Sequence, residues 1–159
     1  MTNSNAQTPT ERLAALGITL PTPSAPAAAY VPVVRTGNLL YVSGQLSMSP
    51  EGLIKGCLGK NISIEEAQIG ARHAALGVLA QIVNNADTPL ENIVKIVKLT
   101  IFVASTPDFD QQHIVANGGS EILAQILGEK GQHARAAFGV ASIPLGAAVE
   151  IEAIVEITQ

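Results

Sequence analysis

Val149-Glu150-Ile151-Glu152-Ala153-Ile154-Val155-Glu156-Ile157, near the end of the chain, places an apolar residue at every second position. Successive side chains of a β-strand point to opposite faces, so this alternation predicts a strand with one buried face. The other face carries three glutamates and one isoleucine. This strand closes a predicted order of helix, three strands, helix, strand, helix and two strands, which is typical of an α+β fold or a mixed sheet with helices on one face.

Two capping boxes upstream predict helices that fit this architecture. Thr8 and Pro9 open a short helix over residues 9–16, and Ser63 opens a long amphipathic helix that runs to about residue 85. The segment 21–29 contains three prolines and is rich in alanine, so it cannot continue a helix. We expect it to form an extended connector on the surface.

A third helix is predicted over residues 109–128 from its apolar periodicity, with Asp108 or Asp110 as the N-cap. The run Asn117-Gly118-Gly119 lies inside it. Each glycine costs about 1 kcal/mol of helix stability, so we expect a break or a bend at this run.

The remaining strands are predicted from runs rich in β-branched residues and from the turns between them. Thr36-Gly37-Asn38 tolerates positive φ and joins two of the strands into a hairpin, and Ser49-Pro50-Glu51-Gly52 precedes a short third strand. The nearly continuous apolar run that begins at Ile93 predicts a buried central strand. These predicted strands cover residues 31–34, 39–43, 53–58, 93–103 and 135–141.

Composition restricts the class of protein. The chain has 159 residues, of which 47% are hydrophobic, 14% charged and 3% aromatic, so it is one folded domain and not a disordered chain. So few charges on so much apolar surface suggest that another subunit covers part of it. Residues 1–7 read as a frayed tail.

Charge and cysteine content exclude several kinds of site. The net charge is −4 and no basic stripe is present, which disfavours nucleic-acid binding. One cysteine excludes an internal disulfide, and the three histidines lack a metal-binding spacing. No signal core and no apolar run of membrane-spanning length occur. We therefore predict a reduced, soluble, cytoplasmic protein without a metal.

Arg135 stands out because nearly all its neighbours in the predicted strand are apolar or small. It can clamp a ligand carboxylate or phosphate, or it can form a salt bridge to Glu150 or Glu152 on the next strand. The glutamates themselves are either a solvated strand face or include a general acid or base opposite Arg135. The residues alone leave these alternatives open. Three neutral hydrogen-bonding residues are further candidates: Tyr30, Ser43 and Asn117.

Taken together, these segments resemble the RidA/YjgF family of imine and enamine deaminases. The C-terminal block carries most of the resemblance: Arg135, then Ile143-Pro144, then the Glu150-Ile151-Glu152-Ala153 strand. Ser43-Gly44-Gln45 is similar to the family's Ser-Gly-Gln turn, and Ala29-Tyr30 to the tyrosine before its first hairpin. The resemblance extends over roughly residues 28–157, so residues 1–28 are read as an N-terminal extension of a domain over 29–159.

The resemblance implies a chorismate-mutase-like fold (bacillus type), a mixed β-sheet with two main helices on one face, assembled as a homotrimer with clefts between subunits. In such a cleft Arg135 would bind the carboxylate of a 2-imino or 2-enamino acid, and Glu150 would orient or activate water. The substrate-binding residues would be Tyr30, Ser43, Gly44, Asn117 and Phe138. No metal and no organic cofactor would be needed. The implied activity is that of a 2-iminobutanoate/2-iminopropanoate deaminase-like hydrolase.

Three departures from the family pattern keep a second function in view. The chain has the N-terminal extension, it is longer between Phe109 and Asn117, and it carries Ala137 where many deaminating members have cysteine. The alternative is a non-catalytic trimer that binds or senses a small carboxylate. An endoribonuclease, an activity attributed to some relatives, ranks third because the basic surface is missing.

Overall fold

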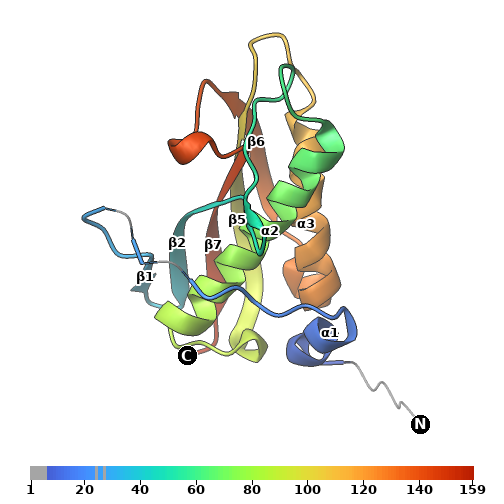
Figure 1. The fold of residues 1–159 in the computed structure, drawn as a ribbon. Helices are drawn as coiled ribbons and strands as arrows, with labels where there is room; N and C mark the ends of the chain where they lie inside the picture. The colour runs from blue at the N-terminus through green and yellow to red at the C-terminus, as the bar shows by residue number, and fades with distance from the viewer. Residues whose placement is uncertain (1–6, 24, 27) are drawn as a thin grey trace.

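A five-stranded mixed sheet forms the centre of the computed structural model, which describes residues 7–23, 25–26 and 28–159 (Figure 1). The strand order is β1-β2-β7-β5-β6, and all neighbours are antiparallel except β5 and β6, which are parallel. The bounds are β1 Val33–Thr36, β2 Leu39–Leu46, β5 Ile93–Ala104, β6 Ala134–Val140 and β7 Val149–Ile157. The predicted tail at residues 1–7 lies, except for Gln7, outside the described residues.

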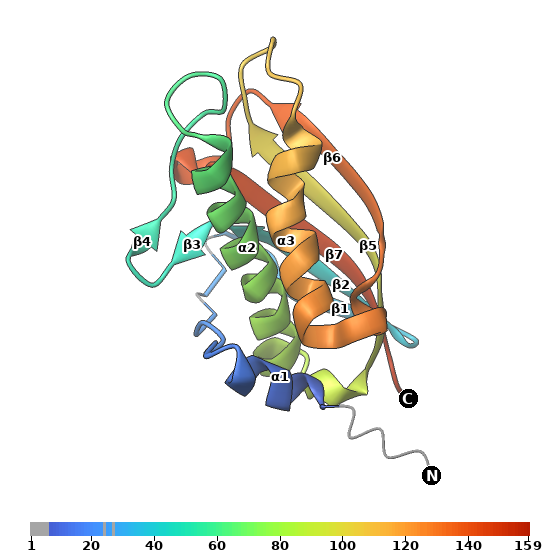
Figure 2. The ribbon, with the colours of Figure 1, turned by 90° about the vertical axis from the view of Figure 1, so that its right-hand side faces the viewer.

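Two long helices, α2 (Ile64–Asn85) and α3 (Gln112–Leu127), cover one face of this sheet (Figures 1 and 2). The short α1 (Pro9–Ala15) packs near the end of α3, and three 3₁₀ turns complete the chain: η1 Leu90–Asn92, η2 Gly128–Gly131 and η3 Pro144–Gly146. The prediction of a mixed α+β sheet with helices on one face is confirmed. Among the described residues, no α-helix covers the opposite face of the sheet.

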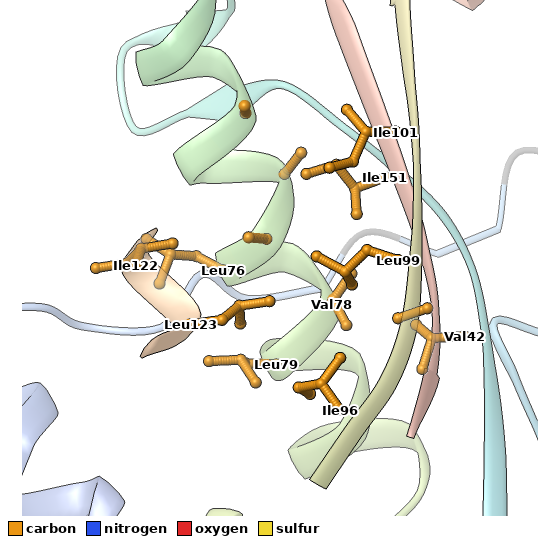
Figure 3. Packing of buried hydrophobic residues seen from close by; sticks show 14 of the residues in the cluster. Val42, Leu76, Val78, Leu79, Ile96, Leu99, Ile101, Ile122, Leu123 and Ile151 are labelled. Atoms are coloured by element: carbon orange, nitrogen blue, oxygen red, sulfur yellow. The ribbon is translucent and has the colours of Figure 1, made fainter. Parts of the chain in front are cut away.

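The alternation in β7 is the basis of the core. Its five apolar positions from Val149 to Ile157 are each 4% exposed or less. Side chains of α2, α3 and β5 pack against them, including Leu79, Leu99 and Leu123 (Figure 3). The predicted one-sided strand is therefore confirmed, and it lies between β2 and β5.

Both predicted capping boxes are present. Thr8 accepts from the Glu11 backbone while the Glu11 side chain accepts from the Thr8 N–H, and Ser63 and Glu66 do the same at α2. Each box satisfies backbone donors that the first helical turn leaves free. The described residues of the predicted connector, 21–23, 25, 26, 28 and 29, form neither helix nor strand.

The predicted third strand at residues 53–58 is wrong. The turn after Ser49 closes a small separate hairpin, β3 (Met48–Ser49) with β4 (Gly52–Leu53), and the chain then makes only isolated bridges at Lys55 and Leu58. Gly56 and Gly59 have φ values of 148° and 85°, outside the pleated conformation of an L residue. They end the strand pattern that the apolar residues indicated.

The predicted break in the third helix is also wrong, because α3 runs unbroken through Gly118 and Gly119. A Cβ at Gly118 would collide with the Gln68 backbone oxygen of α2, and one at Gly119 would lie 2.8 Å from the Ile151 side chain. The pair allows α3 to approach α2 and the sheet closely, and this packing offsets the propensity cost. The N-cap is Gln111, without a side-chain cap, and not Asp108 or Asp110.

The strand predicted as buried and central, β5, is covered on one side only. Ile96, Leu99 and Ile101 are buried beneath the helices, whereas Lys98 and Thr100 lie on the open face. A nearly apolar run thus contributes both to the core and to an uncovered face.

We predict that Gly118→Ala lowers the free energy of unfolding by about 1–3 kcal/mol, although alanine is the better helix former. The added methyl has no room against the α2 backbone. Urea unfolding measures the change. Gln125→Ala, an exposed position on the same helix, is the control and changes the stability by no more than about 0.5 kcal/mol. A Gly118→Ala protein of unchanged or greater stability contradicts the close-packing role.

Candidate functional site

Arg135 lies on β6, the edge strand of the sheet, opposite Leu99 of β5. Because Leu99 is buried beneath the helices, the Arg135 side chain leaves the sheet on the helix side and meets α3. Its Nη1 donates to Asn117 Oδ1 at 2.9 Å and to Ser120 Oγ at 3.2 Å, and its Nη2 donates to the His113 carbonyl at 3.2 Å. We call Arg135, Asn117, Ser120 and the His113 carbonyl the arginine cluster.

The salt bridge considered for Arg135 does not form. Glu150 and Glu152 lie on β7, and β5 separates β7 from β6. Over residues 7–23, 25–26 and 28–159, the one ion pair joins Lys95 to Glu156 at 3.6 Å. Arg135 is held by neutral oxygens, so its charge is not compensated within the described chain.

The hydrogen bonds of Arg135 leave part of the guanidinium free. Of its five N–H donors, three are used, two on Nη1 and one on Nη2. The Nε–H and the second Nη2–H make no hydrogen bond to another described residue. These two nitrogens form one edge of the planar fork, the kind of edge that binds a carboxylate through two parallel hydrogen bonds. The side chain is exposed, so a ligand can reach that edge.

Glu150 lies on the open face of the sheet, opposite Phe102 of β5. Its carboxylate covers Gly44 of β2 so closely that a Cβ at Gly44 would collide with it. Burial raises the pKa of Glu150 above its usual value, and the neighbouring Glu152 charge raises it further. A half-buried carboxyl with a raised pKa is suited to accept and return a proton.

Ser43 and Gly44 form a bulge in β2, where the pairing with β7 shifts between Val42 and Gln45. Tyr30 lies beside this bulge, and Tyr30 and Ser43 line a cavity of about 470 Å³ on the open face. The buried Ser43 hydroxyl has no hydrogen-bond partner among the described residues. An unsatisfied buried hydroxyl costs about 1–3 kcal/mol, so it is a group that a ligand or a partner chain can satisfy.

A chain of side-chain amides fixes the bulge to α2. Asn85 donates to Gln81 at 2.6 Å, Gln81 donates to Gln45 at 3.2 Å, and Gln45 donates to the Ser43 carbonyl at 3.0 Å. Gln81, in the middle of this series, is only 3% exposed, so its side chain is shielded from water. We call Tyr30, Ser43, Gly44 and Glu150 the glutamate cluster.

The candidate residues therefore form two groups and not one. Arg135 and Asn117 lie together on the helix side of the β6 edge, whereas Tyr30, Ser43, Gly44 and Glu150 lie together around β2 and the open face. Within one chain the sheet separates the two groups. Phe138 lies on the open face, its ring packed edge-on against Phe102 at 5.3 Å and 82°.

Within the described ranges, no group of three or more histidine, cysteine or carboxylate side chains is placed to hold a metal ion. None of the helices found there is both long and apolar enough to cross a membrane.

Comparison with known proteins identifies the family. The family model described as Endoribonuclease L-PSP matches residues 22–157. The 2-iminobutanoate/2-iminopropanoate deaminase of Rattus norvegicus is 34% identical over 135 residues, which are 84% of this chain and 85% of that protein. The chain belongs to the RidA/YjgF family. The predicted resemblance is confirmed.

Other relatives are more similar in sequence. Protein TCP17 of Trypanosoma cruzi is 45% identical over 144 residues, 89% of each chain. The crystal structure of Atu1372 from Agrobacterium tumefaciens, a protein of unknown function, superposes with a TM-score of 0.85 at 47% identity over 92% of this chain and 91% of that one. This RidA/YjgF protein therefore shares its fold with solved structures over nearly its whole length.

Sequence reasoning missed Ser120, Gln45 and Gln81 as parts of the site. Ser120 lies three residues after Asn117, so on a helix the two side chains lie on the same face. This spacing could have indicated Ser120, but the helix break predicted at Asn117 removed the basis for using it. Gln45 was recognised only as part of a motif, and nothing local indicated its partner on α2.

Comparing Ser43, whose hydroxyl is buried, with the buried Ser47 tests whether the Ser43 hydroxyl is kept for a ligand. We predict that Ser43→Ala leaves the free energy of unfolding unchanged or raises it by up to about 1 kcal/mol, because no hydrogen bond is lost. Ser47→Ala is the matched control. Ser47 donates to the Ile54 carbonyl and accepts from the Val149 N–H, so its loss costs about 1–3 kcal/mol. Equal losses in urea unfolding contradict the prediction.

Proposed function

We propose that this chain hydrolyses reactive 2-imino and 2-enamino acids without a cofactor, in sites shared between copies of a homotrimer. The observation that carries the proposal is the state of Arg135. Neutral acceptors hold its guanidinium, no carboxylate of the described chain pairs with it, and one edge remains free. A relative at 34% identity is named a 2-iminobutanoate/2-iminopropanoate deaminase, which supports the same substrate class.

The reaction needs an anchored carboxylate and a positioned water. Arg135 binds the substrate carboxylate through its free edge. Glu150, ionised, takes a proton from water as the water oxygen adds to the carbon of the protonated C=N bond, and the nitrogen becomes a neutral amine. Glu150 then returns that proton to the nitrogen. As the C–N bond breaks, Glu150 takes the proton of the new hydroxyl group, so that ammonia and a 2-oxo acid form, and it passes this proton to the departing ammonia. A 2-enamino acid enters the same path after a proton adds at its third carbon.

The remaining candidates surround the substrate in this proposal. Asn117 orients Arg135 through its amide oxygen. The free hydroxyl of Ser43 and the phenol of Tyr30 are hydrogen-bonding groups for the substrate amine or the attacking water. Gly44 leaves space for the Glu150 carboxylate, and Phe138 supplies an apolar wall.

The separation of the two clusters supports a site shared between copies. Within one chain the sheet lies between Arg135 and Glu150, and in the proposed homotrimer a second copy places its arginine cluster against the glutamate cluster of the first. The open face is suited to such contacts, since it exposes Val34, Tyr41 and Phe138. Three sheets that turn their open faces inward would form the chorismate-mutase-like assembly that the resemblance implies.

One observation favours a second function, a trimer that binds a small carboxylate without catalysis. Ala137 follows Arg135 by two residues on β6, where many deaminating relatives carry cysteine. A sensor would use the same Arg135 clamp. Ribonuclease activity has the least support, because the nine lysines and arginines of the chain are outnumbered by thirteen acidic residues.

We expect Arg135→Ala to lower kcat/KM for imine hydrolysis by about 100-fold or more, because the carboxylate loses a charged bidentate partner. An amino-acid oxidase generates the imine, and semicarbazide traps what remains. Arg72→Ala, another exposed arginine, is the control and retains full activity. Carboxylate binding without faster imine loss supports the sensor, and a ligand affinity unchanged in Arg135→Ala rejects both functions.

Mixing two inactive variants tests whether the site is shared. Arg135→Ala and Glu150→Gln, co-expressed in equal amounts, are expected to recover roughly a quarter of the wild-type activity, because that share of clefts combines the intact residue of each copy. The double variant mixed with Arg135→Ala is the control and recovers none. If the two single variants also recover nothing, while each folds and assembles, the clefts do not combine Arg135 and Glu150 from different copies.

A further inference from the structure

Arg135 is the first member of a hydrogen-bond chain that continues beyond its ligand-binding edge. Its Nη1 donates to Ser120 Oγ at 3.2 Å, Ser120 Oγ lies 2.9 Å from His133 Nε2, and His133 Nδ1 lies 2.6 Å from the Gly131 carbonyl. The chain connects β6, α3 and η2.

The chemistry of the groups determines where each proton lies. The Gly131 carbonyl only accepts, so the proton of a neutral His133 ring is on Nδ1. Nε2 is then an acceptor, and the Ser120 hydroxyl donates to it. The Ser120 oxygen therefore accepts a hydrogen bond from Arg135, because the guanidinium has only donors. Each link of the chain has one possible direction, from Arg135 to Gly131.

The surroundings favour the neutral ring. His133 is half-buried, and burial lowers its pKa below the usual value, as does the nearby charge of Arg135. The other charged groups around it are Glu121 of α3, which lines the same cavity of about 370 Å³, and Glu129 and Lys130 of η2. None of these makes an ion pair with His133 in the part of the chain that is described. A second proton on His133 would place an N–H donor against Ser120 and a second cation beside Arg135.

Packing fixes two members of this hydrogen-bond chain, Ser120 and Gly131. Ser120 follows Gly119, which lies in close contact with Ile151 of the sheet. Gly131 is buried, and a Cβ on it would collide with the Leu123 carbonyl of α3. The acceptor carbonyl and the serine are thus held on rigid parts of the fold, which a geometrically precise binding group requires.

We propose that Ser120 and His133 are positioning residues that hold the Arg135 guanidinium so that its Nε and Nη2 edge faces the ligand carboxylate. This inference rests on the proposed function of Arg135 and assigns it a supporting pair. Neither residue touches the substrate. Their effect is on how well the carboxylate binds, because a guanidinium free to rotate loses the match of two parallel hydrogen bonds.

Steady-state kinetics of imine hydrolysis test the proposal. Ser120→Ala is expected to raise KM by about 3- to 30-fold with kcat within about twofold of the wild type, the effect of one hydrogen bond on binding. His133→Gln keeps an acceptor for Ser120 and is expected to retain the wild-type KM, whereas His133→Leu matches Ser120→Ala. Gln132→Ala, an exposed and uncharged position in the same cavity without a bond to Arg135, is the control and leaves both constants unchanged.

The pH dependence separates positioning from a purely structural role. In the wild type KM rises as the pH falls through the lowered pKa of His133, because the protonated ring can no longer accept from Ser120. In His133→Gln this rise disappears, since the amide does not titrate. An unchanged KM in Ser120→Ala, equal KM values in His133→Gln and His133→Leu, or the same acid rise in His133→Gln overturns the proposal.

Nitrogen-15 NMR of the histidine rings tests the hydrogen-bond chain from Arg135 to Gly131 independently of catalysis. The expected spectrum of His133 is that of a neutral ring protonated at Nδ1, in the free protein and at neutral pH. A ring protonated at Nε2 overturns the positioning proposal even if the enzyme is active. A second outcome separates the two proposals. If the ring has the expected form, but imine loss is not accelerated and calorimetry shows no binding of 2-oxobutanoate, the proposed function of Arg135 fails. The positioning proposal then fails with it, because it requires a ligand at Arg135.

Discussion

The burial of one face of the sheet beneath α2 and α3 is the constraint on which the rest of the structure depends. Every second residue of β7 is apolar and enclosed, and the matching residues of β5 and β2 complete the same layer. A strand that gives one face to the core must leave the other outside. The open face, with Glu150 and its apolar neighbours, is a direct consequence of that packing.

The same constraint separates the two halves of the candidate site. The connection from β5 through α3 returns as β6, parallel to β5 and at the edge of the sheet. Arg135 shares its register with a buried leucine, so its side chain meets α3 and not the open face. Glu150 alternates with the buried residues of β7, so its side chain lies on the open face and contacts Gly44. Alternation and strand order together, and neither alone, place the cation and the carboxylate on opposite sides.

Much of the fold was predictable because its signals are local. The capping boxes, the first hairpin and the alternation of β7 each depend on residues a few positions apart, and all three are present. The failures also have local causes that long-range packing overrides. Gly118 and Gly119 looked like a break because their propensity is poor, yet the approach of α2 and Ile151 requires residues without side chains there. Glycines with positive φ ended the short strand after Leu53.

The sequence by itself determined the chemistry of this protein: which strand faces water, where a lone arginine stands among apolar residues, and which motif carries the serine and glycine of the bulge. These depend on side-chain type and on spacings of two to four residues. The tertiary structure alone decided which residues these groups contact. Arg135 donates to Asn117 and Ser120 and pairs with no described glutamate, and Gln81 supports the bulge through Gln45. His133 links Ser120 to the Gly131 carbonyl. These contacts join distant segments, and their geometry follows from strand order and helix packing, which no local pattern encodes.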